Sequence, residues 1–578
     1  MSNSSTIPRT RTVDKRWTER NWTLPFVLIT LLVNAIHVWA LRWFLEPDGV
    51  SYLDIAWAYA RGDARNAVNA FWSPLFSWLL AAVFRLLHPD RFRELAIVHA
   101  LNFAAFMLAL AAFLFLIREI QKWEVALPSP PTMEMLGPGA LSLLSLAAFA
   151  YVSRYTFSPF IDQPDIFVEA LVFADTALLV RIARGDRRSR TFAIFGALLG
   201  LGYLTKTILF PLGIVFLACV FFAAGHTRRA LAHTAIAAVM FLLISVPWIA
   251  AVSQKEGRPI IGTAGHIAYF VYSRGTDASD LWMGGPDGIV PLHPIRVALS
   301  SPPVLLFPST QGTFPPWYDP SFYFAGAVNR FALRSQLRIL RESFASFVQV
   351  LSEKKGPLIG LLVLFLFAGP RRYFGEFLRR WPLWLPSAAA LGAYALVEFS
   401  VRLVEPFLLV LWLALLSAVC VPRSYQGRRL VSAMVAVVVL LLLFPLARAP
   451  RSDFAAIRAP FQPGEHLCGA EWTVAKALRG MGLANGSHVA VVGQVPGHTD
   501  CWAALDGLTI IGEIPSSGAA EYWAAWPDQQ AHILRIFASA SAMAAITYTM
   551  PASAAPSGWQ RIGDSPYYVH LLAAQTPP

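Results

Sequence analysis

The chain has few charged residues and few cysteines for its length. Of its 578 residues only 14% are charged, whereas 56% are hydrophobic. A soluble domain carries roughly a quarter of charged residues, so this composition excludes an ordinary soluble protein. The four cysteines are too few for a disulfide framework, and the chain has no CxxC or HExxH motif, so we expect no zinc site. The net charge of +12 lies mainly in short loops between apolar runs, which favours membrane topology over nucleic-acid binding.

Long apolar runs predict a polytopic membrane protein. Runs of about 17–25 residues match the thickness of a bilayer's hydrocarbon core. The first run follows a basic N-terminal tail, residues 1–21, and leads into acidic residues, so it predicts a retained anchor and not a cleaved signal peptide. The segments expected to cross are 22–45, 94–117, 137–160, 166–183, 192–206, 207–224, 231–251, 345–369, 381–399, 403–420 and 430–447.

A further apolar run, residues 72–88, is short, begins Trp-Ser-Pro and contains Arg85. If this run crossed the membrane, the arginine-rich loops near residues 181–190 and 371–380 would face outward. If it lies along the surface, these loops face the cytoplasm together with the basic N-terminus, as the positive-inside rule requires. We therefore predict an interfacial helix at 72–88 and about eleven transmembrane helices.

The predicted organisation is a transmembrane domain at 22–449 with outer loops at 46–93 and 252–344. Residues 450–578 change character and predict a small extracytoplasmic α/β domain. Its expected strands are 488–493, 508–514 and 545–549, and its expected helices are 470–483 and 518–540. Cys468 and Cys501 both fall in this domain, where an oxidising compartment would join them. Two cysteines alone leave both the free and the bonded state open.

Three acids, Glu46, Asp48 and Asp54, follow the first crossing within nine residues. A carboxylate at the edge of a membrane is partly desolvated, which suits a general base. The alternative is that these acids are solvated loop charges. Asp48 is the candidate base, whereas Asp54 is expected to be structural.

Two further loops are expected on the same outer face. One carries Asp162, Gln163 and Asp165, and the other carries Lys206. Asp165 precedes an apolar run, so a helix N-terminal role competes with a catalytic one. Lys206 is either a phosphate-binding cation or a lysine that extends to the interface. The outer loop 252–344 is rich in proline and aromatic residues, as in Pro315-Pro316-Trp317-Tyr318, and is interpreted as a cover over a cavity or as interfacial aromatics.

These pieces together resemble the bacterial membrane glycosyltransferases of the GT-C fold, in particular the protein mannosyltransferase-like and aminoarabinose transferase-like group. The resemblance covers residues 20–250 and, more weakly, 380–420. It rests on Asp48 with Tyr52, Ser73-Pro74-Leu75, Pro164-Asp165, Gly200-Leu201-Gly202-Tyr203-Leu204-Thr205-Lys206, and Glu398 with Arg402 before Pro406-Phe407. The chain has Trp72-Ser73-Pro74 where the aminoarabinose group has Lys-Pro-Pro, so a phosphate-contacting lysine of that group is absent.

The resemblance implies a sugar donor linked to an isoprenyl phosphate, and a lipid, glycan or protein acceptor. It implies an inverting transfer with Asp48 as general base and Asp165 as a second catalytic residue. The residues that would bind substrate are Lys206, Tyr52, Arg402 and Glu398. No metal and no cofactor are expected, and the compartment is a bacterial inner membrane. The alternative function is a polytopic transporter or flippase of a glycolipid or polysaccharide precursor.

Overall fold

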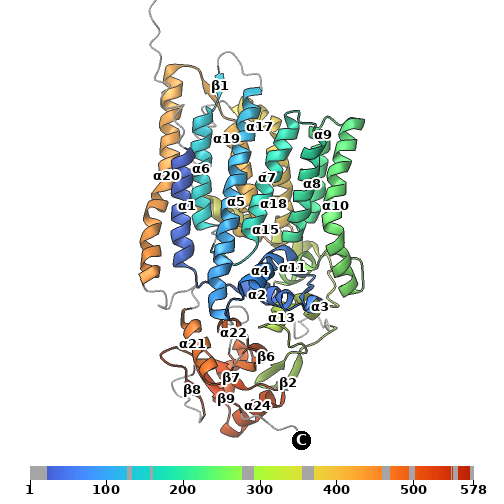
Figure 1. Ribbon diagram of the computed structural model, residues 1–578, viewed down its shortest axis with the longest axis vertical. Helices are drawn as coiled ribbons and strands as arrows, with labels where there is room; N and C mark the ends of the chain where they lie inside the picture. The colour runs from blue at the N-terminus through green and yellow to red at the C-terminus, as the bar shows by residue number, and fades with distance from the viewer. Residues whose placement is uncertain are drawn as a thin grey trace, which may run out of the picture.

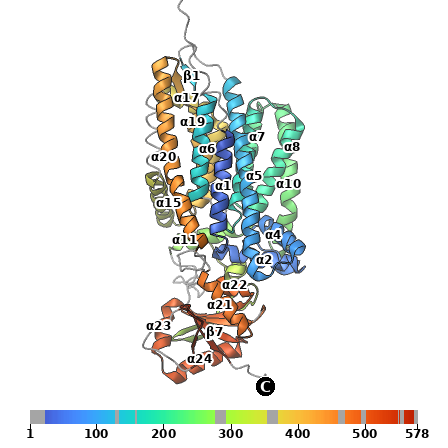
Figure 2. The same ribbon diagram turned by 60° about the vertical axis from the view of Figure 1, so that its left-hand side comes forward.

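The computed structural model of the protein describes residues 23–126, 133–156, 160–275, 292–353, 370–458, 469–483, 485–493, 501–548, 550 and 558–572. Long helices form a bundle, and a smaller α/β domain lies against one end of it (Figure 1). A layer of short helices separates the two, both in this view and after a turn of 60° (Figure 2). The candidate site lies in this middle layer.

The bundle is formed by the apolar segments of the sequence. Its helices are α1 (Thr23–Ala40), α5 (Arg91–Ala126), α6 (Pro138–Tyr155), α7 (Asp165–Ala183), α8 (Ser189–Thr205), α9 (Leu209–Ala223), α10 (Arg228–Glu256), α18 (Trp381–Ala395), α19 (Val401–Ser417) and α20 (Tyr425–Arg458). Helix α7 is buried along most of its length and lies at the centre of the bundle, against α5, α8 and α19. The outer helices instead expose apolar side chains.

Four of the described helices, α1, α5, α10 and α20, are long and apolar enough to cross a membrane by length and composition. Their outer faces expose large apolar side chains such as Leu32, Leu243 and Leu440. An apolar surface of this kind needs a lipid environment, so the chain is a multi-pass membrane protein. The predicted number of eleven crossings stays a prediction. The expected crossing 345–369 begins within α15 (Leu333–Glu353), and its residues 354–369 lie outside the described residues.

The middle layer holds short helices of the outer loops (Figure 1). They are α2 (Pro47–Ala60), α3 (Ala64–Ala67), α4 (Pro74–Leu87), α11 (Ala264–Arg274), α13 (Pro315–Tyr318) and α14 (Pro320–Tyr323). Helix α4 is the expected interfacial helix, and it lies beside α2 at the end of the bundle. Its buried residues Phe76, Leu80 and Phe84 recur every four positions, whereas Leu86 and Leu87 are exposed. This amphipathic pattern is typical of a helix at a membrane surface.

The α/β domain contains a seven-stranded sheet in the order β2-β3-β6-β5-β7-β9-β8. The strands are β2 (Arg296–Ser300), β3 (Pro303–Leu306), β5 (His488–Val492), β6 (Thr509–Ile514), β7 (Ala544–Thr547), β8 (Gln560–Arg561) and β9 (Tyr568–Leu571). Strand β5 is parallel to β6 and β7, and the remaining pairs are antiparallel. The first two strands come from the outer loop 252–344, so residues 450–578 do not form this sheet alone. Helix α20 also continues to Arg458, past the expected boundary at 450.

Alternate residues of the central strands face two different cores. Val489 and Val491 pack with α21 (Gly469–Gly480) and α22 (Cys501–Asp506), in a cluster that continues into α2 and α4. Ala490 and Val492 pack with α23 (Ser516–Ala524) and α24 (Pro527–Ser539) on the opposite face. The period of two is that of a strand buried on both sides. The continuous first core fixes the sheet relative to α2, and thereby relative to the site.

Two details differ from the expectations. The expected helix 518–540 is two helices, because Pro527 begins α24 and cannot continue α23. At the far end of the bundle lie α17 (Pro370–Arg379) and a two-stranded ribbon of β1 (Met133–Met135) and β4 (Cys420–Pro422). Cys501 is disulfide-bonded, and Cys468, the other cysteine of the expected pair, lies outside the described residues.

Candidate active site

Asp48 lies in the first turn of α2, which begins with Pro47. Proline suits the first helical position because its fixed φ matches a helix and its missing N–H would have no partner there. The partial positive charge of the helix N-terminus stabilises the Asp48 carboxylate. One carboxylate oxygen, Oδ1, accepts a hydrogen bond from the indole Nε1 of Trp317 at 3.1 Å. The other, Oδ2, accepts one from Nη2 of Arg402 at 2.9 Å.

Arg402 is the cation that connects the acidic residues of different loops. It lies in the first turn of α19, and its Nη1 is 3.5 Å from Oδ2 of Asp165 and 4.0 Å from Oε2 of Glu46. Its side chain is 32% exposed, compared with 19% for Asp48 and 9% for Asp165. The arginine fork thus reaches Asp48 and Asp165 at once, which is a geometry that a lysine cannot provide.

Lys206 and Asp165 form an ion pair between two helix ends. Asp165 is the first residue of α7, and Lys206 is the C-cap of α8. The lysine Nζ donates to Oδ1 of Asp165, while Arg402 contacts the other oxygen, Oδ2. A single buried carboxylate therefore holds both cations. The predicted convergence of the loops that carry Asp48, Asp165 and Lys206 is confirmed by these contacts.

Behind this cluster, Asp162 fixes the chain at the start of α2. Both of its carboxylate oxygens accept hydrogen bonds from the backbone N–H of Glu46, at 3.2 and 3.1 Å. Burial, with the charge of Glu46 second, raises the pKa of Asp162 well above its usual value. A Cβ on Gly49 would lie 1.5 Å from Oδ2 of Asp162, so only glycine allows this approach. Gln163 in turn donates its side-chain amide to Glu46.

Tyr52 lies beneath Asp48, one helical turn along α2, and is only 4% exposed. Its ring packs edge-on against Trp72 at 5.0 Å and Phe76 at 5.5 Å. Burial raises the pKa of Tyr52 well above its usual value, and the negative charges of Asp48 and Asp165 add to this effect. The phenol therefore stays neutral, and its place in the aromatic cluster gives it a supporting role. The predicted role of Tyr52 in substrate binding stays a prediction.

Glu398 lies in the turn between α18 and α19, and it hydrogen-bonds the hydroxyl of Tyr272. Arg402 and Asp48 both influence Tyr272 electrostatically, so Glu398 and Tyr272 border the cluster. In the described part of the chain, the Glu398 side chain bonds Tyr272 and its backbone N–H bonds the carbonyl of Tyr394, and no hydrogen bond joins it to Asp48 or Lys206. Its predicted role in substrate binding stays a prediction.

Trp317 contacts Asp48, and the sequence alone did not predict this contact. Its loop was consistent with either a cover over a cavity or aromatic residues at the membrane interface. The structure places the Trp317 indole against Asp48. The interpretation of the loop as a cover stays a prediction. The backbone carbonyl of Trp317 accepts hydrogen bonds from Oγ of Ser51 and Nε1 of Trp72, both at 2.9 Å. The Pro315-Pro316 pair that opens α13 was the available signal, because it stiffens the backbone before the tryptophan.

Asp54 contacts the loop that carries Trp317, and its expected structural role stays a prediction. It is buried, and its two carboxylate oxygens accept hydrogen bonds from the backbone N–H of Thr313 at 2.6 Å and from the Thr313 hydroxyl at 3.2 Å. It thereby fastens the loop that carries Trp317 to α2. Within the described residues, no group of three histidine, cysteine, aspartate or glutamate side chains could hold a metal ion. The predicted lack of a metal requirement stays a prediction.

Comparisons with known proteins give structural neighbours only. No protein-family model matches the chain, and no curated protein matches it. The chain is similar to the crystal structure of ArnT from Cupriavidus metallidurans bound to undecaprenyl phosphate, with 15% identity and a TM-score of 0.45 over 96% of this chain and 99% of that chain. The apo structure of the same protein has 16% identity and a TM-score of 0.43, with the same coverage.

The oligosaccharyltransferase of Archaeoglobus fulgidus, in a complex with zinc and sulfate, is also similar. It has 12% identity and a TM-score of 0.41, over 90% of this chain and 67% of that chain. With TM-scores below 0.5 these neighbours carry no argument about function, which is therefore built on the residues of the site.

Proposed function

We propose that the protein is an integral membrane glycosyltransferase that moves a sugar from an isoprenyl-phosphate donor to an acceptor hydroxyl at the outer face of the membrane. The observation that carries the proposal is the bridge that Arg402 makes between Asp48 and Asp165, with Lys206 on the far oxygen of Asp165. A proton acceptor and two cations thus meet at one end of an apolar bundle. This place suits a substrate with a polar head and an apolar tail.

In the proposed reaction, an oxygen of Asp48 takes the proton of the acceptor hydroxyl. Among the contacts within the described residues, each Asp48 oxygen accepts one hydrogen bond, which leaves a second lone pair for this role. The acceptor oxygen forms a bond to the anomeric carbon as the bond from that carbon to the phosphate oxygen breaks. The electrons of the broken bond pass to the isoprenyl phosphate. A single displacement inverts the configuration at the anomeric carbon.

The cations have a separate role, which is to stabilise the leaving phosphate. Negative charge grows on that group in the transition state, and fixed cations in a site with little water stabilise it strongly. Lys206 and Arg402 are held in place by Asp165, which makes Asp165 a positioning residue in this mechanism. Because Asp165 contacts both cations, its loss would misplace both at once.

The test is a donor-cleavage assay on the purified full chain with a polyprenyl-phosphate sugar labelled in the polyprenyl chain. We expect release of free polyprenyl phosphate by the native chain, and a loss of about 100- to 1,000-fold in Lys206→Met, as for other single groups that stabilise a transition-state charge. Lys122→Met is the matched control, because Lys122 is 56% exposed and pairs with Glu119 on α5. Uptake of the intact sugar lipid into proteoliposomes without cleavage would instead favour the transporter and refute the proposal.

A further inference from the structure

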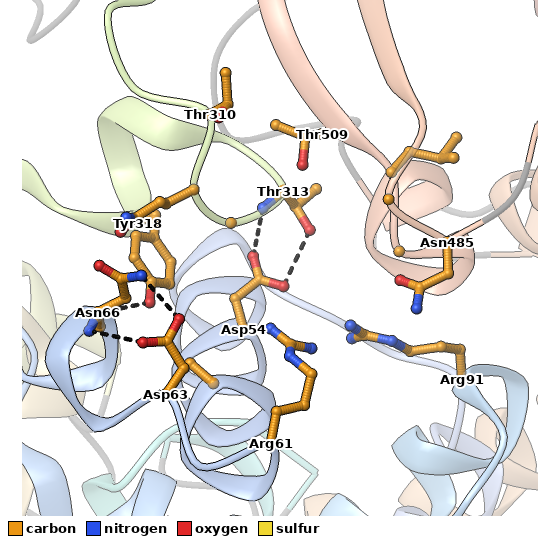
Figure 3. Close-up of a pocket in the computed structure, with 16 residues that line it drawn as sticks. Asp54, Arg61, Asp63, Asn66, Arg91, Thr310, Thr313, Tyr318, Asn485 and Thr509 are labelled. Atoms are coloured by element: carbon orange, nitrogen blue, oxygen red, sulfur yellow. Dashed lines mark hydrogen bonds between the residues drawn. The ribbon is translucent and has the colours of Figure 1, made fainter.

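A polar cavity lies away from the ion pairs around Asp48. Its volume is about 330 Å³, and it is bordered by α2, α3, the loop before α13 and the edge of the sheet domain. In Figure 3 the side chains of Asp54, Arg61 and Arg91 reach into it from one side, and Asn485 and Thr509 face them from the sheet domain. The mechanism above uses none of these five side chains.

The charges of the cavity balance. Arg61 and Arg91 face the carboxylates of Asp54 and Asp63. Asp54 is already hydrogen-bonded to Thr313, and Asp63 accepts from the side-chain amide of Asn66 at 2.8 Å. A site of this kind does not select an anion or a cation by charge.

The remaining polar groups supply both donors and acceptors. Arg91 lies over the ring of Trp57 at 4.7 Å and is 3.6 Å from Glu94. Arg61, by contrast, is exposed and forms no ion pair with any other residue in the described part of the chain. The hydroxyl of Thr509 and the amide of Asn485 have both donor and acceptor capacity.

Tyr318 adds an aromatic ring to the wall of the cavity, and its hydroxyl is already engaged with the carbonyl of Asn66 at 2.9 Å. A balanced set of donors and acceptors beside an aromatic ring matches a compact polyhydroxylated ligand. The volume is within the range of small-molecule sites. We propose that this cavity binds a neutral saccharide unit of the acceptor.

The location of the cavity connects it to Asp48, so this assignment of an acceptor rests on the proposed function. Asp54 and Asp48 are six residues apart on α2, which corresponds to about 9 Å along the helix axis. The loop that contacts Asp54 through Thr313 also contacts Asp48 through Trp317. The cavity and Asp48 thus share one helix and one outer loop.

The experiment measures saccharide binding separately from sugar transfer. Saturation-transfer difference NMR is recorded on the full chain in detergent with a panel of neutral disaccharides: maltose, cellobiose, trehalose and α-1,2-mannobiose. A sulfated and a uronic-acid disaccharide complete the panel. We expect transfer to at least one neutral disaccharide, and a loss of at least threefold in Arg61→Ala and in Thr509→Val. Arg65→Ala is the matched control, because Arg65 is exposed on α3 and does not line the cavity.

Asp48→Asn separates the two proposals. If this variant loses sugar transfer and keeps the saccharide signal, both stand. If native transfer is absent and the signal depends on Arg61 and Thr509, the cavity assignment survives without the enzymatic one. No signal with any neutral disaccharide, a signal with the charged disaccharides alone, or a signal unaffected by Arg61→Ala and Thr509→Val would each overturn the cavity assignment.

Discussion

Replacing Asp48 by asparagine removes the proposed proton acceptor and the charge that pairs with Arg402, while it keeps the shape of the side chain. The amide has the shape of the carboxylate, and its oxygen can still accept the hydrogen bond of Trp317 that is 3.1 Å long in the native chain. Positioned general bases contribute about 100- to 10,000-fold to a rate. This corresponds to about 2.7–5.4 kcal/mol in the activation barrier. We therefore expect kcat of Asp48→Asn to fall within this range.

The effect on folding is expected to be much smaller. The substitution removes the ion pair with Arg402, whose side chain is 32% exposed. A pair screened by solvent to this extent contributes about 1 kcal/mol or less. The kinetic effect should thus exceed the effect on stability several-fold.

The assay compares initial rates of sugar transfer from a polyprenyl-phosphate donor with the unfolding temperature of the same preparation. Asp528→Asn, an exposed carboxylate on α24, is the control and should change neither quantity. A kcat of Asp48→Asn within about threefold of the native value would refute the role of Asp48 as base. So would a loss of activity that is matched by a loss of folded protein.

Three further predictions concern the support of the site. Trp317→Phe keeps an aromatic side chain but removes the hydrogen-bond donor to Asp48. Hydrogen bonds to charged groups contribute about 1.5–3 kcal/mol to stability, so the free energy of unfolding should fall by about this amount, whereas the exposed Trp526→Phe should leave it unchanged. An unchanged unfolding free energy in Trp317→Phe would contradict the contribution of this hydrogen bond. Gly49→Ala places a Cβ 1.5 Å from Asp162, so the chain should lose about 1–3 kcal/mol of stability in thermal unfolding. The control Gly375→Ala, which has open space around it, should not lose stability. Equal unfolding temperatures for the two variants would contradict the close packing of Gly49 against Asp162. Burial raises the pKa of Glu513 on β6 to about 8, so between pH 4.5 and 8 the folded state holds a proton that the unfolded chain releases. The contribution of Glu513 to stability should therefore be greatest below pH 4.5 and should fall as the pH rises towards 8. Glu513→Gln should flatten this dependence in near-ultraviolet circular dichroism melts from pH 5 to 9, whereas Glu521→Gln should leave it unchanged.

Part of the candidate site could be predicted from the sequence because it depends on chain direction and membrane topology. The acids at 46–54 follow one apolar run, Asp165 precedes another, and Lys206 ends a third. If the segments cross in the predicted order, these ends must lie on one face. The ion pairs of Asp165 with Lys206 and Arg402 agree with that reasoning. The prediction that residues 72–88 lie along the membrane surface followed from the same balance of positive charge.

Other features depend on contacts between residues that are far apart in the chain. Trp317 and Asp48 are separated by 269 positions, and no local pattern pairs an indole with a particular carboxylate. Likewise, β3 pairs with β6 although they lie in different parts of the sequence, because an unpaired sheet edge binds whichever strand the folded chain brings to it. The cavity beside Asp54 likewise has one wall from the outer loop, at Thr310 and Thr313, and another from the C-terminal part of the chain, at Asn485 and Thr509.

The amino-acid sequence by itself determined that this chain lies in a membrane, where its long apolar helices are, and which loops carry the charged residues that meet at one end of the bundle. Hydrophobic length and the placement of positive charge are local properties, so they can be read along the chain. Only the tertiary structure decided which side chain holds which charge, that Arg402 bridges two acids, and that a loop and a distant sheet enclose a polar cavity. These outcomes depend on packing in three dimensions, which brings together groups that the sequence keeps apart.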